Sequence, residues 1–91
     1  MIAKRVIFKG RVQGIGFRYT AREIANGFDV CGTVRNLIDG TVELEVMGEP
    51  EEIEAYLQHI TEESVVAHFI KECQVDEIPL LEDAHGFKIA R

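Results

Sequence analysis

The spacing of the hydrophobic residues alternates along the chain between the two-residue period of strands and the longer period of helices, and this order restricts the fold most. Strands are predicted at residues 4–12, 30–36, 41–47, 65–75 and 86–89. Helical spacing is predicted from Phe17 to Phe28 and again in the segment that begins at Pro50. The elements therefore follow in the order strand, helix, strand, strand, helix, strand, with a short strand at the end.

The third predicted strand, residues 41–47, has a single apolar face. Its apolar side chains are Val42, Leu44 and Val46, which alternate with Thr41, Glu43 and Glu45. Each predicted helix also has an apolar stripe that another element must cover. An antiparallel sheet with both helices on one face meets these requirements together. The sequence thus predicts an α+β fold, the ferredoxin-like sandwich of order βαββαβ, as a single domain over residues 1–91.

Local signals predict how several elements begin and end. A left-handed residue within positions 26–29 is expected to end the first helix, and Asp39-Gly40 is expected to form a hairpin turn. Pro50 suits the first turn of the second helix. The buried stripe of that helix is predicted to be Ile53, Leu57 and Ile60, with Tyr56 beside it. The interrupted alternation of residues 65–75 indicates a β-bulge.

Charge is distributed unevenly along the chain, whose formal net charge at pH 7 is −6. The first 22 residues contain no Asp or Glu, and their basic residues are Lys4, Arg5, Lys9, Arg11, Arg18 and Arg22. An acidic protein repels polyanions, which argues against broad nucleic-acid binding. A small anion is still attracted to a locally basic segment, so the first 22 residues are the candidate anion-binding region.

The sequence has no pattern typical of a membrane or secreted protein, and we expect a cytoplasmic location. No apolar run approaches the roughly 18 residues of a membrane span, and no apolar core of a secretory signal follows the first basic residues. Cys31 and Cys73 are too few for a disulfide-rich domain and are expected to be thiols in strands, although the sequence leaves their pairing open. The histidines, which lack ligand spacing, are His59, His68 and His85.

A glycine-rich turn, residues 10–16, connects the first predicted strand to the first helix. Glycines in such a turn allow successive main-chain N–H groups to point inward and form an anion-binding nest. The unpaired N–H groups and dipole of the helix that begins near Phe17 favour the same anion. Arg18 could hold two oxygens of a phosphate through its planar guanidinium. A Gly-x-Gly before a helix is also typical of tight packing, so the turn alone does not decide the function.

Residues 10–18, GRVQGIGFR, resemble the signature of the acylphosphatases, which hydrolyse the mixed anhydride of a carboxylic acid and phosphate. A second family motif, G-x-V-x-N, is matched by residues 32–36, GTVRN, and Asp39-Gly40 follows it. The resemblance extends over essentially the whole chain, including the Gly-Phe-x-Ile ending at residues 86–89. It implies the ferredoxin-like fold, a hydrolase acting on small acyl phosphates, and no cofactor or metal.

The resemblance also implies roles for individual residues. Main-chain N–H groups are expected to bind the phosphoryl group, and they belong to Gln13, Gly14, Ile15, Gly16, Phe17 and Arg18. Arg18 is expected to clamp that group and Asn36 to orient the attacking water, so both are candidate catalytic residues. Inorganic phosphate or sulfate is expected to compete with the substrate. The enzyme is expected to be a monomer with no nucleic-acid or membrane partner.

Other interpretations of the same residues remain open at this point. Arg18 could be an ordinary surface residue of the helix, and Asn36 could start the following turn through its side chain. RNA-recognition modules share the order βαββαβ, but the polar face of residues 41–47 lacks the aromatic side chains that stack on bases. A similar domain begins the hydrogenase-maturation carbamoyltransferases, where zinc-binding segments follow; here no CxxC is present, which favours a stand-alone enzyme.

Overall fold

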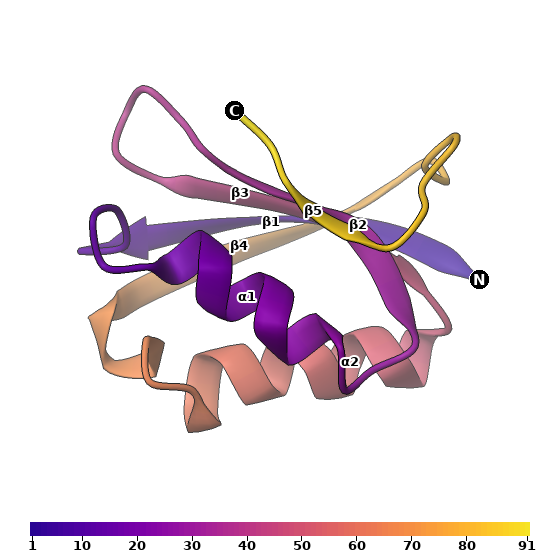
Figure 1. Ribbon diagram of the computed structural model, residues 1–91, viewed down its shortest axis with the longest axis horizontal. Helices are drawn as coiled ribbons and strands as arrows, with labels where there is room; N and C mark the ends of the chain where they lie inside the picture. Colours follow the sequence, from indigo (N-terminus) through magenta and orange to yellow (C-terminus); the bar gives the residue numbers. More distant parts are fainter.

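A sheet with two helices on one face forms the architecture of the computed structural model, which describes all residues, 1–91 (Figure 1). The elements in chain order are β1 (Ile2–Gly10), α1 (Phe17–Ala25), β2 (Val30–Asn36), β3 (Val42–Gly48), α2 (Pro50–Gln58), the π-helix η1 (His59–Glu63) that continues α2, the short 3-10 helix η2 (Ala67–Phe69), β4 (Ile70–Ile78) and β5 (Phe87–Ile89). This order and layering confirm the ferredoxin-like α+β prediction. No helix is long and apolar enough to cross a membrane.

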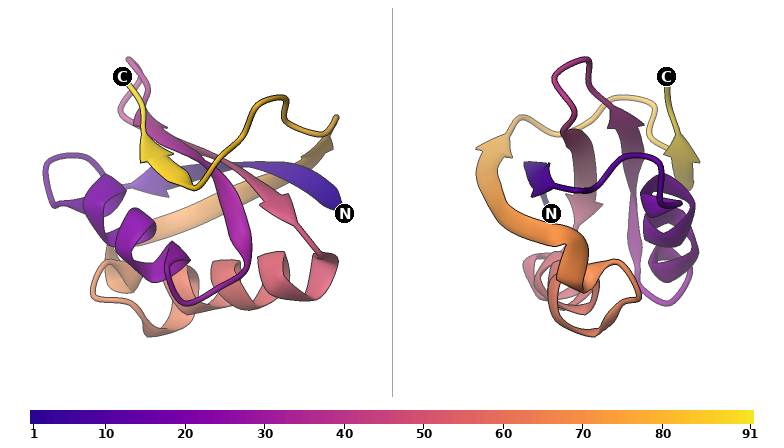
Figure 2. Two further views of the ribbon diagram at one scale, coloured as in Figure 1. Left: turned by 45° about the vertical axis from the view of Figure 1, so that its right-hand side comes forward. Right: turned by 90° about the vertical axis from the view of Figure 1, so that its left-hand side faces the viewer.

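The strands lie in the order β4-β1-β3-β2-β5, and the sheet is mixed. The pairs β4–β1, β1–β3 and β3–β2 are antiparallel, but β5 pairs with β2 in parallel. The prediction of a purely antiparallel sheet is therefore wrong at this edge. Because β4 ends at the end of the sheet where β2 begins, residues 79–86 cross there and enter β5 in the same direction as β2 (Figure 2).

The core lies between the sheet and the two helices. Alternate residues of three strands point toward the helices and are fully buried, namely Val6, Phe8, Val34, Val42, Leu44 and Val46. The helices and the turn after α2 contribute Phe17, Ala21, Ala25, Ile53, Tyr56, Ile60 and Val66. Burial of these apolar side chains is the main favourable term that holds helices and sheet together. Tyr56 belongs to the fully buried stripe of α2, whereas Leu57, predicted for that stripe, is only half-buried.

The phenol of Tyr56 ties the two helices together. Its hydroxyl donates a hydrogen bond of 2.8 Å to the carbonyl of Ala21 in α1. The ring also contacts Phe28 and Phe87, with centroid distances of 5.9 and 5.6 Å. Burial raises the pKa of the Tyr56 phenol above its ordinary value of 10.0, because the charged form would lose its hydration.

Replacing Tyr56 with phenylalanine is expected to lower the free energy of unfolding by about 1 kcal/mol at pH 7, through loss of one buried hydrogen bond. In the wild type, the unfolded state releases the Tyr56 proton above pH 10 while the folded state keeps it. The stability should therefore fall as the pH rises above about 10, by up to ~1.4 kcal/mol per pH unit. Urea titrations from pH 7 to 11 measure this, and the variant should show a smaller alkaline loss than the wild type.

Three predicted boundaries differ from the structure by two residues or more: the strand predicted at 4–12 spans Ile2–Gly10, the strand predicted at 65–75 spans Ile70–Ile78, and the first helix, predicted to reach Phe28, ends at Ala25. The strand predicted at 65–75 begins only at Ile70, because Ser64 turns the chain and directs Val66 into the core instead. Its Oγ donates to the carbonyl of Ile60 at 2.7 Å and accepts the N–H of Val66 at 3.3 Å. The β-bulge predicted within residues 65–75 is confirmed: Lys9 and Gly10 of β1 pair with Glu72 and Ile70, so Lys71 of β4 is the extra, unpaired residue.

The first helix ends without the predicted left-handed residue. It stops at Ala25, and no residue from 26 to 29 has a positive φ. Instead, the N–H groups of Gly27 and Phe28 donate to the carbonyls three residues earlier, at 3.0 and 3.1 Å, which tightens the last turn. The N–H of Asp29 then donates to Glu52 at 2.7 Å, which fixes the entry into β2.

The two cysteines are both free thiols. Cys31 lies on β2 and Cys73 on β4, and two strands separate them in the sheet. Burial, with a smaller contribution from Asp29, raises the pKa of the Cys31 thiol. The sequence left open whether the two cysteines form a disulfide. In the structure they do not, because they lie on strands that are not neighbours in the sheet.

The outer face of the sheet, opposite the helices, contains a network of ion pairs. Glu43 accepts a hydrogen bond of 2.7 Å from Nε of Arg35 and also lies 3.5 Å from Arg5. Arg5 in turn lies 3.6 Å from Glu45. The outward residues of β1 and β3 include no aromatic side chain, so this face lacks the stacking platform of an RNA-recognition module.

Candidate active site

The loop between β1 and α1 presents main-chain N–H groups that have no acceptor within the protein. Arg11 donates its N–H to the carbonyl of Phe69 at 3.1 Å, and Thr20 donates to Gly16 at 2.9 Å. Between them, no N–H from Gln13 to Tyr19 donates a hydrogen bond inside the protein. Successive free donors of this kind are suited to binding an anion.

Gly14 and Gly16 give the loop its shape. Both have φ of +79°, a left-handed conformation that side chains other than glycine rarely adopt. A Cβ added at either position would meet no atom within 4 Å, so tight packing is not the reason for these glycines. Packing does explain Gly10, where an added Cβ would clash with the carbonyl oxygen of Phe69. The two glycines of the loop are therefore required by backbone conformation, and open space lies beside them.

The start of α1 is electrostatically suited to an anion. Gly16 precedes the helix, no side chain caps its N-terminus, and its first turn contains no acidic residue. The positive end of the helix dipole therefore faces solvent without a neutralising group. Phe17 anchors this end, because its ring is buried and lies 4.9 Å from the ring of Phe8.

Arg18 and Asn36 meet in one small hollow. Its volume is about 150 Å³, and its lining residues are Gly16, Phe17, Arg18, Tyr19, Asn36 and Ile89. Arg18 comes from the first turn of α1 and Asn36 from the last position of β2. No acidic side chain lines the hollow, and the guanidinium of Arg18 has no ion pair or hydrogen bond with another residue. The structure thus brings the two candidate catalytic side chains together and leaves both unengaged.

Asn36 does not start the turn that follows β2. Its side chain makes no hydrogen bond, and Asp39 forms the turn instead, accepting the N–H and the hydroxyl of Thr41 at 3.0 and 2.6 Å. These hydrogen bonds, the hydroxyl first, lower the pKa of the Asp39 carboxyl. Gly40 supplies the positive φ of +93°. The Asp-Gly prediction for this hairpin is confirmed, and the alternative role of Asn36 is wrong.

Gln13 connects the glycine-rich loop to the β2–β3 hairpin. Its side-chain Nε2 donates to the carbonyls of Leu37 and Thr41 at 2.7 and 2.9 Å. Leu37 directly follows Asn36, so the side-chain amide of Gln13 fixes the glycine-rich loop relative to Asn36, which lines the hollow. The side chain of Gln13 is therefore a brace.

Replacing Gln13 with alanine is expected to destabilise the protein by about 1–3 kcal/mol, since two partly buried carbonyls lose their donor. It should also lower kcat/KM roughly tenfold, because the loop and Asn36 lose their fixed relation. Thermal unfolding measures the first effect, and hydrolysis of the acyl phosphate substrate that the sequence resemblance implies measures the second. Gln74→Ala is the matched control, since Gln74 is exposed on β4 and its side chain hydrogen-bonds only to Asp76. A Gln13→Ala variant with wild-type stability and rate would contradict the brace.

The residues that line the hollow are only partly those that the sequence predicts to bind phosphate or take part in catalysis. Gly16, Phe17, Arg18 and Asn36 line it, whereas Gln13, Gly14 and Ile15 lie outside its lining. Tyr19 and Ile89 line it and were not singled out. Tyr19 had a usable signal, because it directly follows Arg18 in the first turn of a helix. Ile89 had none, because it reaches the hollow only through the pairing of β5 with β2.

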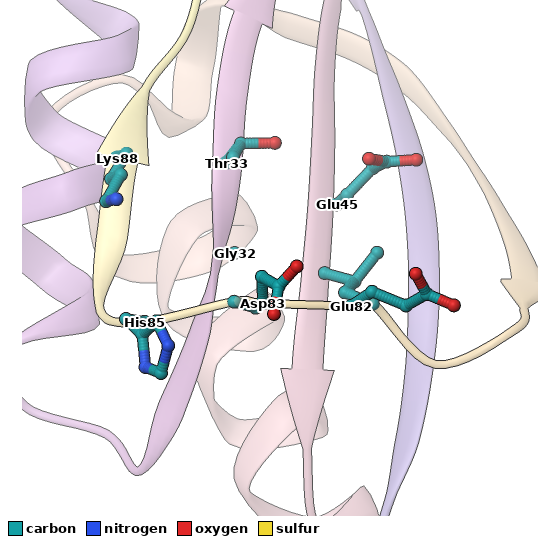
Figure 3. A pocket seen from close by; sticks show the side chains of 9 residues that line it. Gly32, Thr33, Glu45, Glu82, Asp83, His85 and Lys88 are labelled. Atoms are coloured by element: carbon teal, nitrogen blue, oxygen red, sulfur yellow. The ribbon is translucent and has the colours of Figure 1, made fainter.

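A larger hollow of about 260 Å³ lies on the outer face of the sheet, beneath the segment that crosses from β4 to β5 (Figure 3). Its lining includes the carboxylates of Glu45, Glu82 and Asp83, together with His85 and Lys88. These carboxylates would repel a phosphate. The histidines are scattered, and no group of His, Cys, Asp and Glu side chains has the arrangement of a metal site. The smaller hollow is therefore the better candidate for anion chemistry.

Comparisons with known proteins point to one family, over nearly the whole chain and in the overall fold. The sequence model of the acylphosphatase family matches residues 4–89. An acylphosphatase from Enterococcus faecalis is 34% identical over 85 residues, which are 93% of this chain and 93% of that protein. The crystal structure of acylphosphatase from Bacillus subtilis has a TM-score of 0.89 and 32% identity, covering 100% of both chains. The structure of T. kodakarensis HypF has a TM-score of 0.86 and 30% identity, covering 100% of this chain and 12% of that one.

Proposed function

The chain belongs to the acylphosphatase family, and we propose that the hollow between Arg18 and Asn36 is its active site. The activity is hydrolysis of acyl phosphates, in which the carboxyl-phosphate bond is cleaved to give a carboxylate and inorganic phosphate. The observation that carries the site assignment is the meeting of an unpaired guanidinium and an unbonded amide in one hollow without carboxylates.

The phosphoryl group is bound by the loop and the start of α1. The N–H groups from Gln13 to Arg18 supply donors for its oxygens, and the φ of +79° at Gly14 and Gly16 supports this arrangement. The guanidinium of Arg18 adds a charge-assisted, two-pronged contact. Because the charge of a loose phosphoryl-transfer transition state spreads over the equatorial oxygens, these fixed donors stabilise it without having to move.

Asn36 orients the attacking water. Its amide is neutral at every working pH, and its carbonyl oxygen accepts a hydrogen bond from the water, which directs the water oxygen toward phosphorus. The new P–O bond forms as the bond between phosphorus and the carboxylate oxygen breaks. The proton released by the water passes to an oxygen of the phosphate. A carboxylate is a stable leaving group, so no general acid is needed.

Turnover is expected to vary little between about pH 5 and 8, because no Asp, Glu or His lines the hollow. Initial rates of benzoyl phosphate hydrolysis across this range check the expectation. The triple variant His59→Gln, His68→Gln, His85→Gln should give the same flat profile. A bell-shaped profile that disappears in this variant would assign the reaction to a histidine general base and contradict the mechanism.

Competition by inorganic anions tests the site directly. Inorganic phosphate and sulfate should inhibit competitively, because either presents the tetrahedral oxygens that the loop and Arg18 bind. The activity should also persist in EDTA, since the donors of the loop and Arg18 perform the charge stabilisation that a metal would otherwise supply. Non-competitive inhibition, or loss of activity in EDTA that Mg²⁺ restores, would overturn this proposal.

A further inference from the structure

Part of the active-site hollow has no role in phosphoryl chemistry. Arg18 and Asn36 are polar, and Gly16 and Phe17 contribute the start of the helix, but Tyr19 and Ile89 are large apolar residues. Resting on the proposed function, we propose that Tyr19 and Ile89 form a subsite for the acyl half of the substrate and favour acyl groups that are aromatic.

Tyr19 is unusually exposed for a large ring beside a functional site. Its side chain is 56% exposed, although it directly follows Arg18 in the first turn of α1. An exposed aromatic ring offers apolar area that a bound group can cover, and aromatic pairs gain further from offset or edge-to-face contact. A phosphoryl group held by Arg18 would therefore place its acyl substituent in a hollow that Tyr19 helps to line.

Arg22 holds the ring of Tyr19 in place. Its guanidinium carbon lies 5.2 Å from the ring centroid, a cation–π contact between residues three apart on the helix. This contact covers one face of the ring and reduces its freedom before any substrate binds. A ring that is already oriented loses less conformational entropy on binding, which strengthens its contact with an acyl group.

Ile89 supplies the other apolar part of the wall from a fixed strand. It lies opposite Val34 in the parallel pairing of β5 with β2, and the N–H of Ala90 donates to the carbonyl of Val34 at 2.9 Å. The short strand β5 therefore completes the active-site hollow as well as extending the sheet. Its position explains why an apolar residue from the end of the chain lies beside residues of α1 and β2.

The subsite predicts a preference that depends on the acyl group. A benzoyl group is large enough to cover Tyr19 and Ile89, whereas the methyl group of acetyl phosphate covers little of either. The readout is thus the ratio of kcat/KM for benzoyl phosphate to kcat/KM for acetyl phosphate. Tyr19→Ala should lower this ratio about five- to tenfold. The inhibition constant of inorganic phosphate should stay at its wild-type value.

Three further variants make the experiment decisive. Tyr19→Phe keeps the ring and should restore the wild-type ratio. Ile89→Val, which shortens the wall but keeps a β-branched residue in β5, should lower the ratio about two- to threefold. Leu80→Ala is the matched control, because Leu80 is also an exposed apolar side chain, 55% exposed, but lies outside the hollow. Leu80→Ala should leave the ratio unchanged.

Equal losses on both substrates, or a wild-type ratio in Tyr19→Ala, would overturn the subsite. If Tyr19→Ala raised the inhibition constant of inorganic phosphate by the same factor as it lowered kcat/KM for benzoyl phosphate, Tyr19 would act on the phosphoryl group. That result would also overturn the subsite. These outcomes differ from failure of the proposed function, which would appear as wild-type hydrolysis of both substrates by an Arg18→Ala variant.

Discussion

Replacing Arg18 with alanine is expected to lower kcat/KM for benzoyl phosphate roughly a thousandfold, while the fold remains intact. Removal of one preorganised donor costs about a hundred- to a thousandfold in rate, and loss of a phosphate-clamping arginine reaches the upper end of this range or beyond. The stability should hardly change, because the guanidinium of Arg18 has no partner in the protein. Steady-state kinetics and thermal unfolding measure the two properties.

Two further substitutions separate the geometry of the guanidinium from its charge. Arg18→Lys keeps the charge but loses the planar guanidinium, so we expect its kcat/KM for benzoyl phosphate to remain at least tenfold below that of the wild type. Arg11→Ala removes the same charge from the loop that precedes α1, but Arg11 is exposed and lies outside the hollow. Solvent screening should keep the loss in Arg11→Ala to about threefold or less. Equal losses in Arg11→Ala and Arg18→Ala would show a general electrostatic effect and contradict the clamp.

Replacing Asn36 with alanine is expected to lower kcat roughly a hundred- to a thousandfold with little change in KM. The attacking water would lose its orientation, while the groups that bind the phosphoryl oxygens would stay in place. The free energy of unfolding should change by less than about 0.5 kcal/mol, because the Asn36 side chain makes no hydrogen bond in the folded protein. The inhibition constant of inorganic phosphate should stay near its wild-type value.

The inhibition constant of inorganic phosphate distinguishes the roles of Arg18 and Asn36. Phosphate inhibition should weaken strongly in Arg18→Ala and persist in Asn36→Ala. Asn36→Asp has nearly the same shape but adds a negative charge, which would repel the phosphoryl group and should reduce activity at least as much. Asn26→Ala is the matched control, since Asn26 is an exposed asparagine at the end of α1. A large rise in KM without a fall in kcat for Asn36→Ala would contradict its role with water.

The local parts of the site were readable from the sequence. The strand predicted at residues 30–36 has the same bounds in the structure, which places Asn36 at its end. The helix begins at Phe17 as predicted, and the two glycines before it adopt the left-handed conformation that only glycine adopts readily. These features depend on the backbone preferences of a few adjacent residues, so a short stretch of sequence is enough to indicate them.

The predictions that failed depend on competition between local preference and packing. Residues 65–69 have the composition of a strand, but Val66 gains more by entering the core than by extending β4. Tyr56 was predicted beside the buried stripe of α2, yet it lies in that stripe because its hydroxyl finds an acceptor in Ala21. Neither outcome can be read from a segment alone, because the partner that decides it is distant in the chain.

Sequence alone therefore determined the order of strands and helices and the glycine-rich loop, because periodicity and glycine conformation are properties of neighbouring residues. The candidate pair of Arg18 and Asn36 is what the family resemblance of the sequence implies. Only the tertiary structure decided that β5 runs parallel to β2, that Ile89 reaches the hollow and that the side chain of Arg18 has no acidic partner. Those outcomes depend on which segments meet in space, and that is settled by the burial of apolar faces across the whole chain.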